Sequence, residues 1–337
     1  MALTDEQGHI NIGQSPTSIN HDLFDGSQLK FADFFCGIGG FHLAASALGM
    51  KCVFACDIDL QAQETYHANF NIRPVGDISK IKATNVPDHD LLFAGFPCQP
   101  FSIIGKQNGF ADPRGTLFFD LLKIIKEKKP MGIILENVKQ LATADKGRII
   151  ERILKDLENT RYEVDYKILN ALNFGLPQKR ERTIIVGSLT GLKDFSWPEQ
   201  TITMRPLSEF LEIDPDDRFF VSKRIRKKRA SLHKPMDTPS IWHENKSGNV
   251  SSYPYSCALR AGASHNYLLV DGERRLTPRE NLRLQGFPDS FKIVCTDAQV
   301  KKQAGNAVAV PVVQAVMGRL EDVIRRSEIT GECKKAL

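Results

Sequence analysis

Residues 29–49 read LKFADFFCGIGGFHLAASALG and combine a strand, a tight turn and a helix in one stretch. The apolar run LKFADFF is typical of a buried strand. CGIGG is a glycine-rich turn, and FHLAASALG predicts a short helix that ends at Gly49, because glycine commonly stands just beyond a helix. A strand, a turn and a helix in this order form the opening unit of an α/β domain.

The chain after this stretch keeps alternating between apolar strand candidates and amphipathic helix candidates. Such alternation predicts a doubly wound α/β domain with a mostly parallel sheet, because each helix crosses over between parallel strands. The further strands are predicted at 51–56, 90–95, 131–138, 162–171 and 182–187, and the further helices at 57–70, 116–129 and 147–159.

A change in periodicity and composition after about residue 187 indicates a second, smaller, loop-rich domain. Residues 190–265 hold few periodic runs, many prolines and both tryptophans. In RRLTPRENLRLQGFPD (274–289), Thr277, Pro278 and Glu280 predict a capped helix start, and a last helix is predicted from Gly305 to 326. The expected divisions are a flexible leader (1–28), a main domain (29–188 with 305–327), the loop-rich domain (189–272), a hinge (273–304) and a flexible tail (328–337).

The composition limits the classes of function. A net charge of +5 over 337 residues is compatible with a polyanionic partner but does not require one. Charged residues interrupt every apolar run before it reaches membrane-spanning length, and the N-terminus lacks the features of a secretion signal. The seven cysteines form no CxxC pair, so we expect reduced thiols in the cytoplasm, with neither disulfides nor a metal site.

Ligand-binding residues are expected beyond the carboxyl ends of the strands. Asp57 follows the second strand, 20 residues after Gly37 of the glycine turn, and is suited to binding ribose hydroxyls. Alternatively, Asp57 only caps the helix that follows. Asp77 is suited to an adenine amino group. Because the turn has neither a lysine nor a Walker pattern, a nucleoside without a polyphosphate fits, and S-adenosylmethionine is such a molecule.

A cysteine follows the third strand, in AGFPCQPFSIIGKQNGF (94–110). Structural burial is the usual role of a free cysteine. Here, however, Pro97 and Pro100 fix the chain direction around Cys98. The polar, glycine-containing segment that follows is expected to be a mobile lid. Cys98 is therefore the candidate nucleophile.

Charged residues complete the candidates at this edge. Glu136 follows the apolar run GIIL, and a partly buried carboxyl group there is suited to donating a proton; a satisfied structural acid is the alternative. The run QKRER (178–182) precedes the last strand, and its arginines are suited to planar, bidentate recognition if they face the same crevice. A solvated charged turn is the alternative there.

Together these elements resemble the DNA (cytosine-5) methyltransferase family of bacterial restriction–modification systems. The resemblance covers roughly residues 30–188 and 273–316, and it implies a Rossmann-like methyltransferase fold with 189–272 as the target-recognition domain. The matching stretches are DFFCGIGGFHLA, DIDLQAQETY, GDIS, AGFPCQPFSIIG, RGTLFFDLL, ILENV, NALNFGLPQKRER, RLTPRENLRLQGFPD and GNAVAVPVV.

The resemblance implies a mechanism. Cys98 would add as a thiolate to C6 of cytosine, so that C5 can attack the methyl group. Glu136 would contact N3 and the exocyclic amine, Arg182 would hold the O2 side, and Arg180 would support the lid and site. The family implies water or hydroxide as the base that removes the C5 proton. The catalytic residues implied are Cys98, Glu136, Arg182, Arg180, Gln99 and Asn137.

The cofactor that the resemblance implies is S-adenosylmethionine, with S-adenosylhomocysteine as the product. Phe35 and Ile58 would sandwich the adenine region, and Asp57 would bind the ribose at a position where many members carry glutamate. The cofactor-binding residues implied are Phe35, Gly37, Ile38, Gly39, Asp57, Ile58, Asp77, Ile78, Pro97, Leu117, Asn306 and Ala307.

The substrate implied is double-stranded DNA, from which the target base must be flipped out because the stack hides C5 and C6. The lid would close over the base, and the basic run KRIRKKR (223–229) of the recognition domain would bind phosphates. A solvated charged face is the alternative for that run. The DNA-binding residues implied are Ser102, Lys106, Arg114, Lys223, Arg224, Arg226, Lys227, Lys228 and Arg229.

The function expected is methylation of a short specific DNA sequence by a cytoplasmic, monomeric enzyme, paired with a restriction endonuclease. One alternative is tRNA methylation, but that branch carries a Cys-Phe-Thr element, whereas the recognition region here holds only Cys257, followed by Ala258 and Leu259. The other alternative is a DNA-binding regulator without catalysis, against which the intact Cys98 and Glu136 argue. The sequence does not identify the bases that are recognised.

Overall fold

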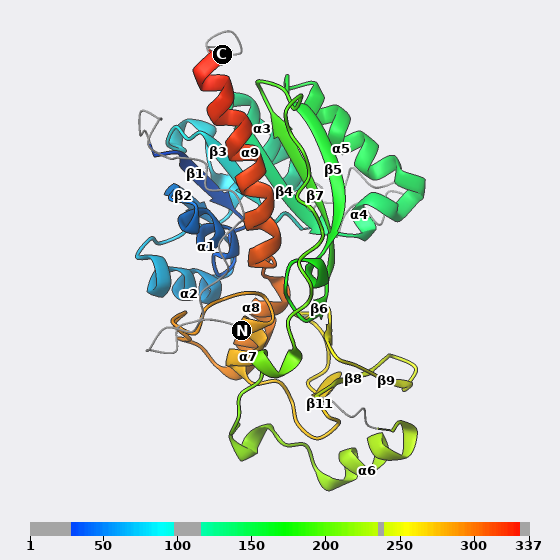
Figure 1. Cartoon of the computed structure of the whole chain (residues 1–337). Helices are drawn as coiled ribbons and strands as arrows, with labels where there is room; N and C mark the ends of the chain where they lie inside the picture. Colours follow the sequence, from blue (N-terminus) through cyan, green and yellow to red (C-terminus); the bar gives the residue numbers. More distant parts are fainter. Residues whose placement is uncertain (1–27, 98–115, 235–238, 331–337) are drawn as a thin grey trace, which may run out of the picture.

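A computed structural model describes residues 28–97, 116–234 and 239–330, and Figure 1 shows a larger body above a smaller one. In these ranges the larger body contains a six-stranded sheet with the order β2-β1-β3-β4-β7-β5. β1 to β4 are parallel, while β7 runs antiparallel to both β4 and β5. The predicted doubly wound, mostly parallel sheet is confirmed. Its strands are β1 Lys30–Phe34, β2 Lys51–Cys56, β3 Leu91–Ala94, β4 Gly132–Val138, β5 Glu163–Asn170 and β7 Glu181–Ser188.

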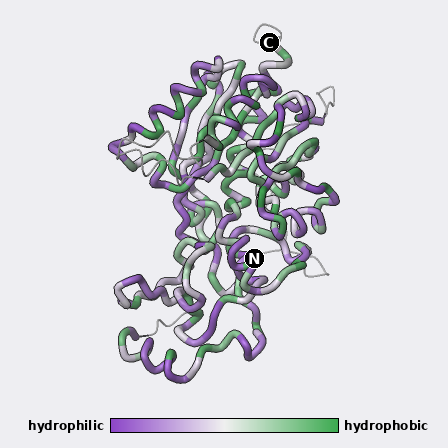
Figure 2. Tube along the Cα trace, turned by 180° about the vertical axis from the view of Figure 1, so that it is seen from behind, coloured by the Kyte–Doolittle hydropathy of each residue, from purple (hydrophilic) through white to green (hydrophobic). Residues whose placement is uncertain are grey.

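Helices cover both faces of this sheet because its strands are apolar on both sides. Successive side chains point to opposite faces. Phe31 and Phe93 therefore share one core with α1, α2 and α9, whereas Phe34 and Leu92 share the other with α3 and α5. Hydrophobic stretches accordingly concentrate in the larger body (Figure 2). The helices are α1 Gly40–Ala47, α2 Leu60–Phe70, α3 Thr116–Lys128, α5 Arg148–Glu158 and α9 Val310–Thr330.

The smaller body holds short elements joined by long connections, as the loop-rich composition predicts. Its antiparallel sheet has the order β11-β8-β9, and α6 lies at the lower end of the molecule (Figure 1). No helix in the described ranges is long and apolar enough to cross a membrane. The elements are α6 Lys223–Leu232, β8 Ile241–Glu244, β9 Val250–Tyr253 and β11 Leu268–Val270, with β6 Gln178–Lys179, β10 Ser256–Cys257 and α4 Gln140–Thr143 elsewhere.

Two helices, α7 Pro278–Arg283 and α8 Asp297–Asn306, lead the chain back to the larger body. The predicted capping box is confirmed: the Thr277 hydroxyl accepts the Glu280 amide at 3.2 Å, and the Glu280 carboxylate accepts the Thr277 amide at 2.8 Å. Glu280 is 0% exposed, so no carboxylate in the described chain is more buried. It also pairs with Arg274 at 2.8 Å. The start of the hinge is thereby fixed in one conformation.

The single helix predicted from Gly305 to 326 is wrong at its start. Gly305 and Asn306 end α8, and α9 begins only at Val310. Pro311 gives the reason, because proline fits the first turn of a helix but lacks the N–H that an interior position requires. α9 also extends to Thr330, which shortens the predicted flexible tail; residues 331–337 and the leader up to residue 27 lie outside the described residues. The other domain boundaries stay predictions.

His42 is a buried titratable residue in the core between α1 and α2. Its Nδ1 lies 2.7 Å from the Tyr66 hydroxyl, and its ring stacks on Phe70 at a centroid distance of 3.9 Å. Burial lowers the pKa of His42 to about 4. Because the pKa is lower in the folded than in the unfolded chain, the unfolded chain binds more protons as the pH falls below about 6.5.

We therefore predict that His42 lowers the free energy of unfolding as the pH falls from about 6.5 to 4, by about 3 kcal/mol in total. Denaturant unfolding of the wild type and of His42→Gln at pH 7 and pH 4 measures this contribution, since the uncharged amide removes it. The two proteins should differ in their pH dependence by that amount. Parallel pH profiles would show that His42 does not titrate on unfolding.

Candidate active site

The carboxyl ends of β1 to β4 meet at one edge of the sheet, where doubly wound folds bind ligands. β7 starts at this same edge because it is antiparallel, and Arg182 stands opposite Val138 in the register. The topology thus gathers the glycine turn after β1, Asp57 after β2, Pro97 after β3 and Glu136 near the end of β4. These residues come from four separate stretches of sequence.

The glycine turn after β1 is shaped by left-handed backbone conformations. Phe35, Gly37 and Gly39 have φ values of 53°, 54° and 89°. A Cβ atom at Gly39 would lie 2.2 Å from the Phe70 ring, so packing as well as φ requires glycine there. Ile38 is buried in the core, and its side chain therefore supports the turn from beneath.

Asp57 fastens the glycine turn to the end of β2. Its Oδ2 accepts the Gly37 amide at 2.7 Å, and its Oδ1 accepts the Asp59 amide at 2.8 Å. The cap of α2 is Asp59, which binds the amides of Gln61 and Ala62, so Asp57 is not the helix cap. Burial raises the pKa of Asp57, and the two amides offset part of that shift. Each oxygen keeps a lone pair for a ligand hydroxyl.

Asp33 is a candidate that sequence reasoning missed. It lies within β1 and is 0% exposed, and neither carboxyl oxygen makes a hydrogen bond of good geometry in the described chain, although the His42 backbone amide is close enough to offset part of the rise in its pKa. Burial raises its pKa strongly, and the neighbouring Asp57 adds to the shift. An acid inside the apolar run FADFF was the signal available in the sequence. A buried unpaired carboxyl group needs a donor or a cation to satisfy it.

The remaining expected cofactor contacts differ in exposure. Ile58 is 71% exposed, which leaves an apolar surface beside Asp57 for a ligand ring. Asp77 caps a short 3-10 helix through Oδ1, which accepts the Ser79 amide at 3.0 Å and the Ser79 hydroxyl at 2.8 Å. Hydrogen bonding to Ser79 lowers the pKa of Asp77. Of the others, Pro97 and Asn306 are exposed, Leu117 is half-buried, and Ile78 and Ala307 are buried.

Glu136 and Arg182 form an ion pair at the centre of this edge. Oε1 of Glu136 lies 3.0 Å from Nε of Arg182, and the two side chains are 12% and 15% exposed. The second carboxyl oxygen, Oε2, makes no hydrogen bond within the described chain, and it lies near Gly95. The pair therefore presents an acceptor at this edge of the sheet, together with the guanidinium donors that Glu136 and the Glu181 carbonyl leave free.

Asn137, the residue after Glu136, ties β4 to the loop that follows β3. Its buried Nδ2 donates to the Phe96 carbonyl at 2.9 Å, and its Oδ1 accepts the Val138 amide at 2.8 Å. Phe96 stands two residues before Cys98, so Asn137 positions the start of that segment. Cys98 and Gln99 lie outside the described residues, as do Ser102, Lys106 and Arg114.

Arg180 is completely enclosed and differs from Arg182 in this respect. Its guanidinium donates to the carbonyls of Leu259, Gly305 and Ala307 at 3.1, 3.2 and 2.6 Å. Burial lowers the pKa of Arg180 to about 9, which leaves it charged at pH 7. Arg180 therefore acts as a positioning residue that joins three segments through its terminal nitrogens, while its buried Nε has no partner in the described chain.

The basic run 223–229 forms most of α6, but its members are not equivalent. Arg229 is 1% exposed and pairs with Glu244 at 2.7 Å, and Lys228 pairs with the same carboxylate at 3.0 Å. The prediction of Arg229 as a phosphate contact is therefore wrong in this conformation, because its charge holds α6 against β8. Lys223, Arg224, Arg226 and Lys227 form no ion pair in the described chain.

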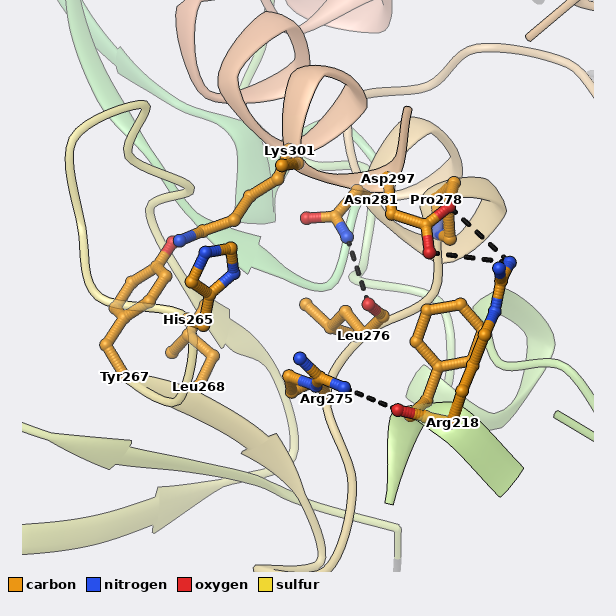
Figure 3. A pocket seen from close by; sticks show the side chains of 12 residues that line it. Arg218, His265, Tyr267, Leu268, Arg275, Leu276, Pro278, Asn281, Asp297 and Lys301 are labelled. Carbon is orange, nitrogen blue, oxygen red and sulfur yellow. Dashed lines mark hydrogen bonds and ion pairs between the residues drawn. The ribbon is translucent and has the colours of Figure 1, made fainter. Parts of the chain in front are cut away.

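Two cavities lie outside this edge. One, of about 550 Å³, separates α6 from residues 271–273. The other, of about 230 Å³, lies between the smaller body and helices α7 and α8 (Figure 3). Arg218, Arg275 and Lys301 give the second cavity a basic lining, and Arg218 pairs with Asp297 at 3.4 Å. Neither cavity contains Glu136 or Arg182, so neither is the centre described above.

The amino-acid sequence is similar to those of known proteins. The family model described as "C-5 cytosine-specific DNA methylase" matches residues 29–322. The chain is 53% identical over 289 residues to the type II methyltransferase M.NgoBI of Neisseria gonorrhoeae, covering 85% of this chain and 91% of the relative. It is 51% identical over 296 residues to M.HaeII of Haemophilus aegyptius, covering 87% and 93%.

Solved structures share the fold at much lower identity. The methyltransferase EhMeth of Entamoeba histolytica matches with a TM-score of 0.69 at 20% identity, covering 89% of this chain and 99% of that one. The Dnmt2 methyltransferase of S. pombe matches with a TM-score of 0.67 at 22% identity, covering 88% and 99%. These likenesses support the methyltransferase fold and carry no information about the substrate.

The enclosure of Arg180 generates a stability prediction. Arg180→Lys keeps the charge but removes the planar set of donors, so one ammonium group would have to serve three buried carbonyls. Each unsatisfied buried group costs about 1–3 kcal/mol. We predict that the free energy of unfolding, measured by urea titration, falls by about 3 kcal/mol.

The matched control is Arg73→Lys, since Arg73 forms an exposed ion pair with Glu64, with side chains 57% and 60% exposed. That change should alter the free energy of unfolding by less than about 0.5 kcal/mol. Equal effects of the two substitutions would contradict the positioning role of Arg180.

Proposed function

Since the chain belongs to the C-5 cytosine-specific DNA methylase family, we propose that it methylates C5 of one cytosine within a specific DNA sequence. The Glu136–Arg182 pair is the observation that supports this most directly. An acidic and a basic group at 3.0 Å offer complementary contacts to the polar edge of a single base. The match to a DNA methylase family model, together with about 50% identity to two type II methyltransferases, favours duplex DNA over the tRNA alternative.

Glu136 and Arg182 hold the flipped cytosine in this proposal. Oε2 of Glu136 faces N3 and the exocyclic amine, while the guanidinium of Arg182 donates to O2. Protonation at N3 by Glu136 offsets the negative charge that develops when a nucleophile adds to the ring. Arg182 serves both partners, because its Nε keeps Glu136 in place and its Nη1 donates to the Glu181 carbonyl at 2.9 Å, while Nη2 makes no hydrogen bond in the described chain.

Cys98 is the nucleophile in this proposal. Its thiolate forms a bond to C6, and the electron pair of the C5–C6 double bond makes C5 nucleophilic. After C5 has gained a methyl group, a base removes the C5 proton, the C5–C6 double bond reforms, and the thiolate leaves. Asn137 contributes by fixing the Phe96 carbonyl two residues before the nucleophile.

The residues at the glycine turn fit S-adenosylmethionine, which supplies the methyl group when bound. Asp57 has lone pairs left for the two ribose hydroxyls, and exposed Ile58 provides an apolar contact for the adenine ring. Asp77 keeps one carboxyl oxygen for the adenine amino group. Asp33 is a buried carboxyl group that makes no hydrogen bond of good geometry in the described chain, and the cationic amine of this cofactor would satisfy it.

The exposed cations of α6 bind DNA phosphates in this proposal, whereas the lid expected at Ser102 to Gly115 lies outside the described residues. The biological setting is that of a restriction–modification system, in which methylation protects host DNA from a cognate endonuclease. This setting places the enzyme in the bacterial cytoplasm, at the nucleoid when it is bound to DNA. It is expected to act as a monomer, and the catalytic residues argue against a purely regulatory DNA-binding role.

Methyl transfer from labelled S-adenosylmethionine to duplex DNA tests the function. We expect label in 5-methylcytosine, and we expect Cys98→Ser to lose turnover while it still binds the cofactor. Glu136→Gln should reduce kcat by about 100- to 10,000-fold, because proton donation in the transition state contributes that much. The absence of labelled 5-methylcytosine with the wild type would refute the function, and an active Cys98→Ser would place the nucleophile elsewhere.

The salt dependence of DNA binding tests the role of α6. The triple variant Lys223→Gln, Arg224→Gln, Lys227→Gln should reduce the slope of log affinity against log salt by about 2 to 3, at roughly 0.9 per phosphate contact. The matched control removes three exposed lysines from the larger body, far from α6 in Figure 1. The control positions are Lys126, Lys155 and Lys167. An equal slope for both triple variants would favour a solvated charged face.

A further inference from the structure

Residues 259–266, called loop 259–266 below, connect the smaller body to the active-site edge. The loop precedes β11 and carries only one cation, Arg260. Its backbone is held by residues from the larger body and from α8, although several of its own side chains are exposed. An exposed loop with an anchored backbone can present side chains in a defined geometry.

The first residue of the loop, Leu259, is held by hydrogen bonds to both its backbone amide and its backbone carbonyl. The Leu259 amide donates to Oε1 of Gln178 at 3.0 Å, and its carbonyl accepts from Arg180 at 3.1 Å. Gln178 is itself 0% exposed and donates to the Leu284 carbonyl at 2.7 Å. The residue directly before Arg260 therefore has little freedom to move relative to the active-site edge.

The outer part of the loop is fastened by Lys301 and Tyr267. Lys301 donates to the carbonyls of Ala263 and Ser264 at 2.5 and 3.0 Å, and Figure 3 shows it reaching from α8 toward the Tyr267 ring. The Tyr267 hydroxyl accepts the Arg260 amide at 3.0 Å. Burial raises the pKa of Tyr267 to about 12, so the hydroxyl stays protonated at neutral pH.

Gly305 brings the loop directly against the active-site edge. A Cβ atom at Gly305 would lie 2.4 Å from the Ala261 amide nitrogen and 2.7 Å from the Arg260 carbonyl carbon, so the two backbones touch. Three residues further on, the Val308 side chain lies near Gly95, beside Glu136. Three residues span at most about 10 Å. The backbone of Arg260 therefore lies within roughly 10 Å of Val308, the residue beside Gly95 and Glu136.

The Arg260 side chain is exposed and lies against an aromatic ring. Its Cζ lies 4.9 Å from the centroid of the Tyr267 ring, on which a guanidinium can stack while its in-plane N–H groups stay free. In the described chain these N–H groups take part in no hydrogen bond or ion pair; only the backbone amide of Arg260 is used. Lys301 lies nearby, and burial together with the charge of Arg260 lowers the pKa of its ammonium group.

We propose that Arg260 is a specificity-determining residue, which recognises a guanine within about three base pairs of the target cytosine through O6 and N7. The inference rests on the proposed function, because it assumes that the target base lies at the Glu136–Arg182 pair. Because the loop lies within roughly 10 Å of this edge and stacked bases are about 3.4 Å apart, the Arg260 side chain can reach only bases close to the flipped cytosine. A guanidinium can bind either a phosphate or a guanine edge in bidentate fashion, so the experiment must distinguish the two.

A binding selection from a random-sequence DNA duplex library, followed by sequencing, tests this inference and identifies the recognised sequence in the same experiment. It compares the wild type, Arg260→Gln, Arg260→Lys and the control Arg319→Gln, which changes an exposed arginine of α9. The wild type should select a motif with a guanine within three base pairs of a fixed cytosine. Arg260→Gln should lose the preference at that guanine by about 10- to 100-fold and keep it at the other positions, and Arg260→Lys should lose part of it, because one ammonium group replaces the planar pair of donors. Arg319→Gln should select the wild-type motif.

The outcomes separate a base contact from its alternatives. Uniformly weaker binding of Arg260→Gln to all sequences, with a salt slope reduced by about 1, would identify a phosphate contact and overturn the inference. A wild-type motif retained by both Arg260 variants would overturn it as well. The unfolding temperature of each variant must equal that of the wild type. If Arg260→Gln fails to fold, the motif selected by Arg260→Lys decides between a base contact and a phosphate contact. Bisulfite sequencing of the selected duplexes after incubation with S-adenosylmethionine tests the methyl transfer separately, so a failure of the enzymatic function is distinguishable.

Discussion

Arg180 carries a buried guanidinium whose three carbonyl acceptors lie 79, 125 and 127 residues away in the sequence. One acceptor belongs to loop 259–266, one to the end of α8 and one to the link before α9. A buried charge must be satisfied by polar partners, so the three segments are held together or the charge is left unpaired. The relation between the smaller body and the active-site edge depends on this constraint.

The second requirement is the antiparallel direction of β7. If β7 ran parallel to β4, its first residues would lie at the opposite edge of the sheet, and Arg182 could not reach Glu136. The observed pairing places Arg182 opposite Val138 and brings Nε within 3.0 Å of the Glu136 carboxylate. Because Arg180 and Arg182 belong to the same short stretch, the structural and the substrate-facing arginine are fixed together. The active site and the link to the recognition region therefore share one anchor.

Much of this arrangement could be predicted from sequence, because strand–turn–helix order determines which residues reach the carboxyl edge. Asp57 and Glu136 were predicted in this way, since each stands where an apolar run ends, whereas Arg182 was singled out of QKRER only by the family resemblance. Partners that are distant in the sequence could not be predicted. The charge run at 223–229 gives no sign that Glu244 would bury Arg229, and the start of α9 depends on a single proline. Asp33 was overlooked because the apolar residues on either side of it predict a strand whether or not an acidic residue stands between them.

In the proposed reaction, Cys98 adds to C6 of a cytosine held by Glu136 and Arg182. A DNA duplex that carries 5-fluorocytosine in place of cytosine tests it most directly, because fluorine at C5 leaves no proton to remove and the covalent adduct cannot eliminate. With S-adenosylmethionine present, mass spectrometry of the digested complex should find the nucleotide on the peptide that contains Cys98. An adduct on another residue, or none from protein that binds both DNA and cofactor, would contradict the account.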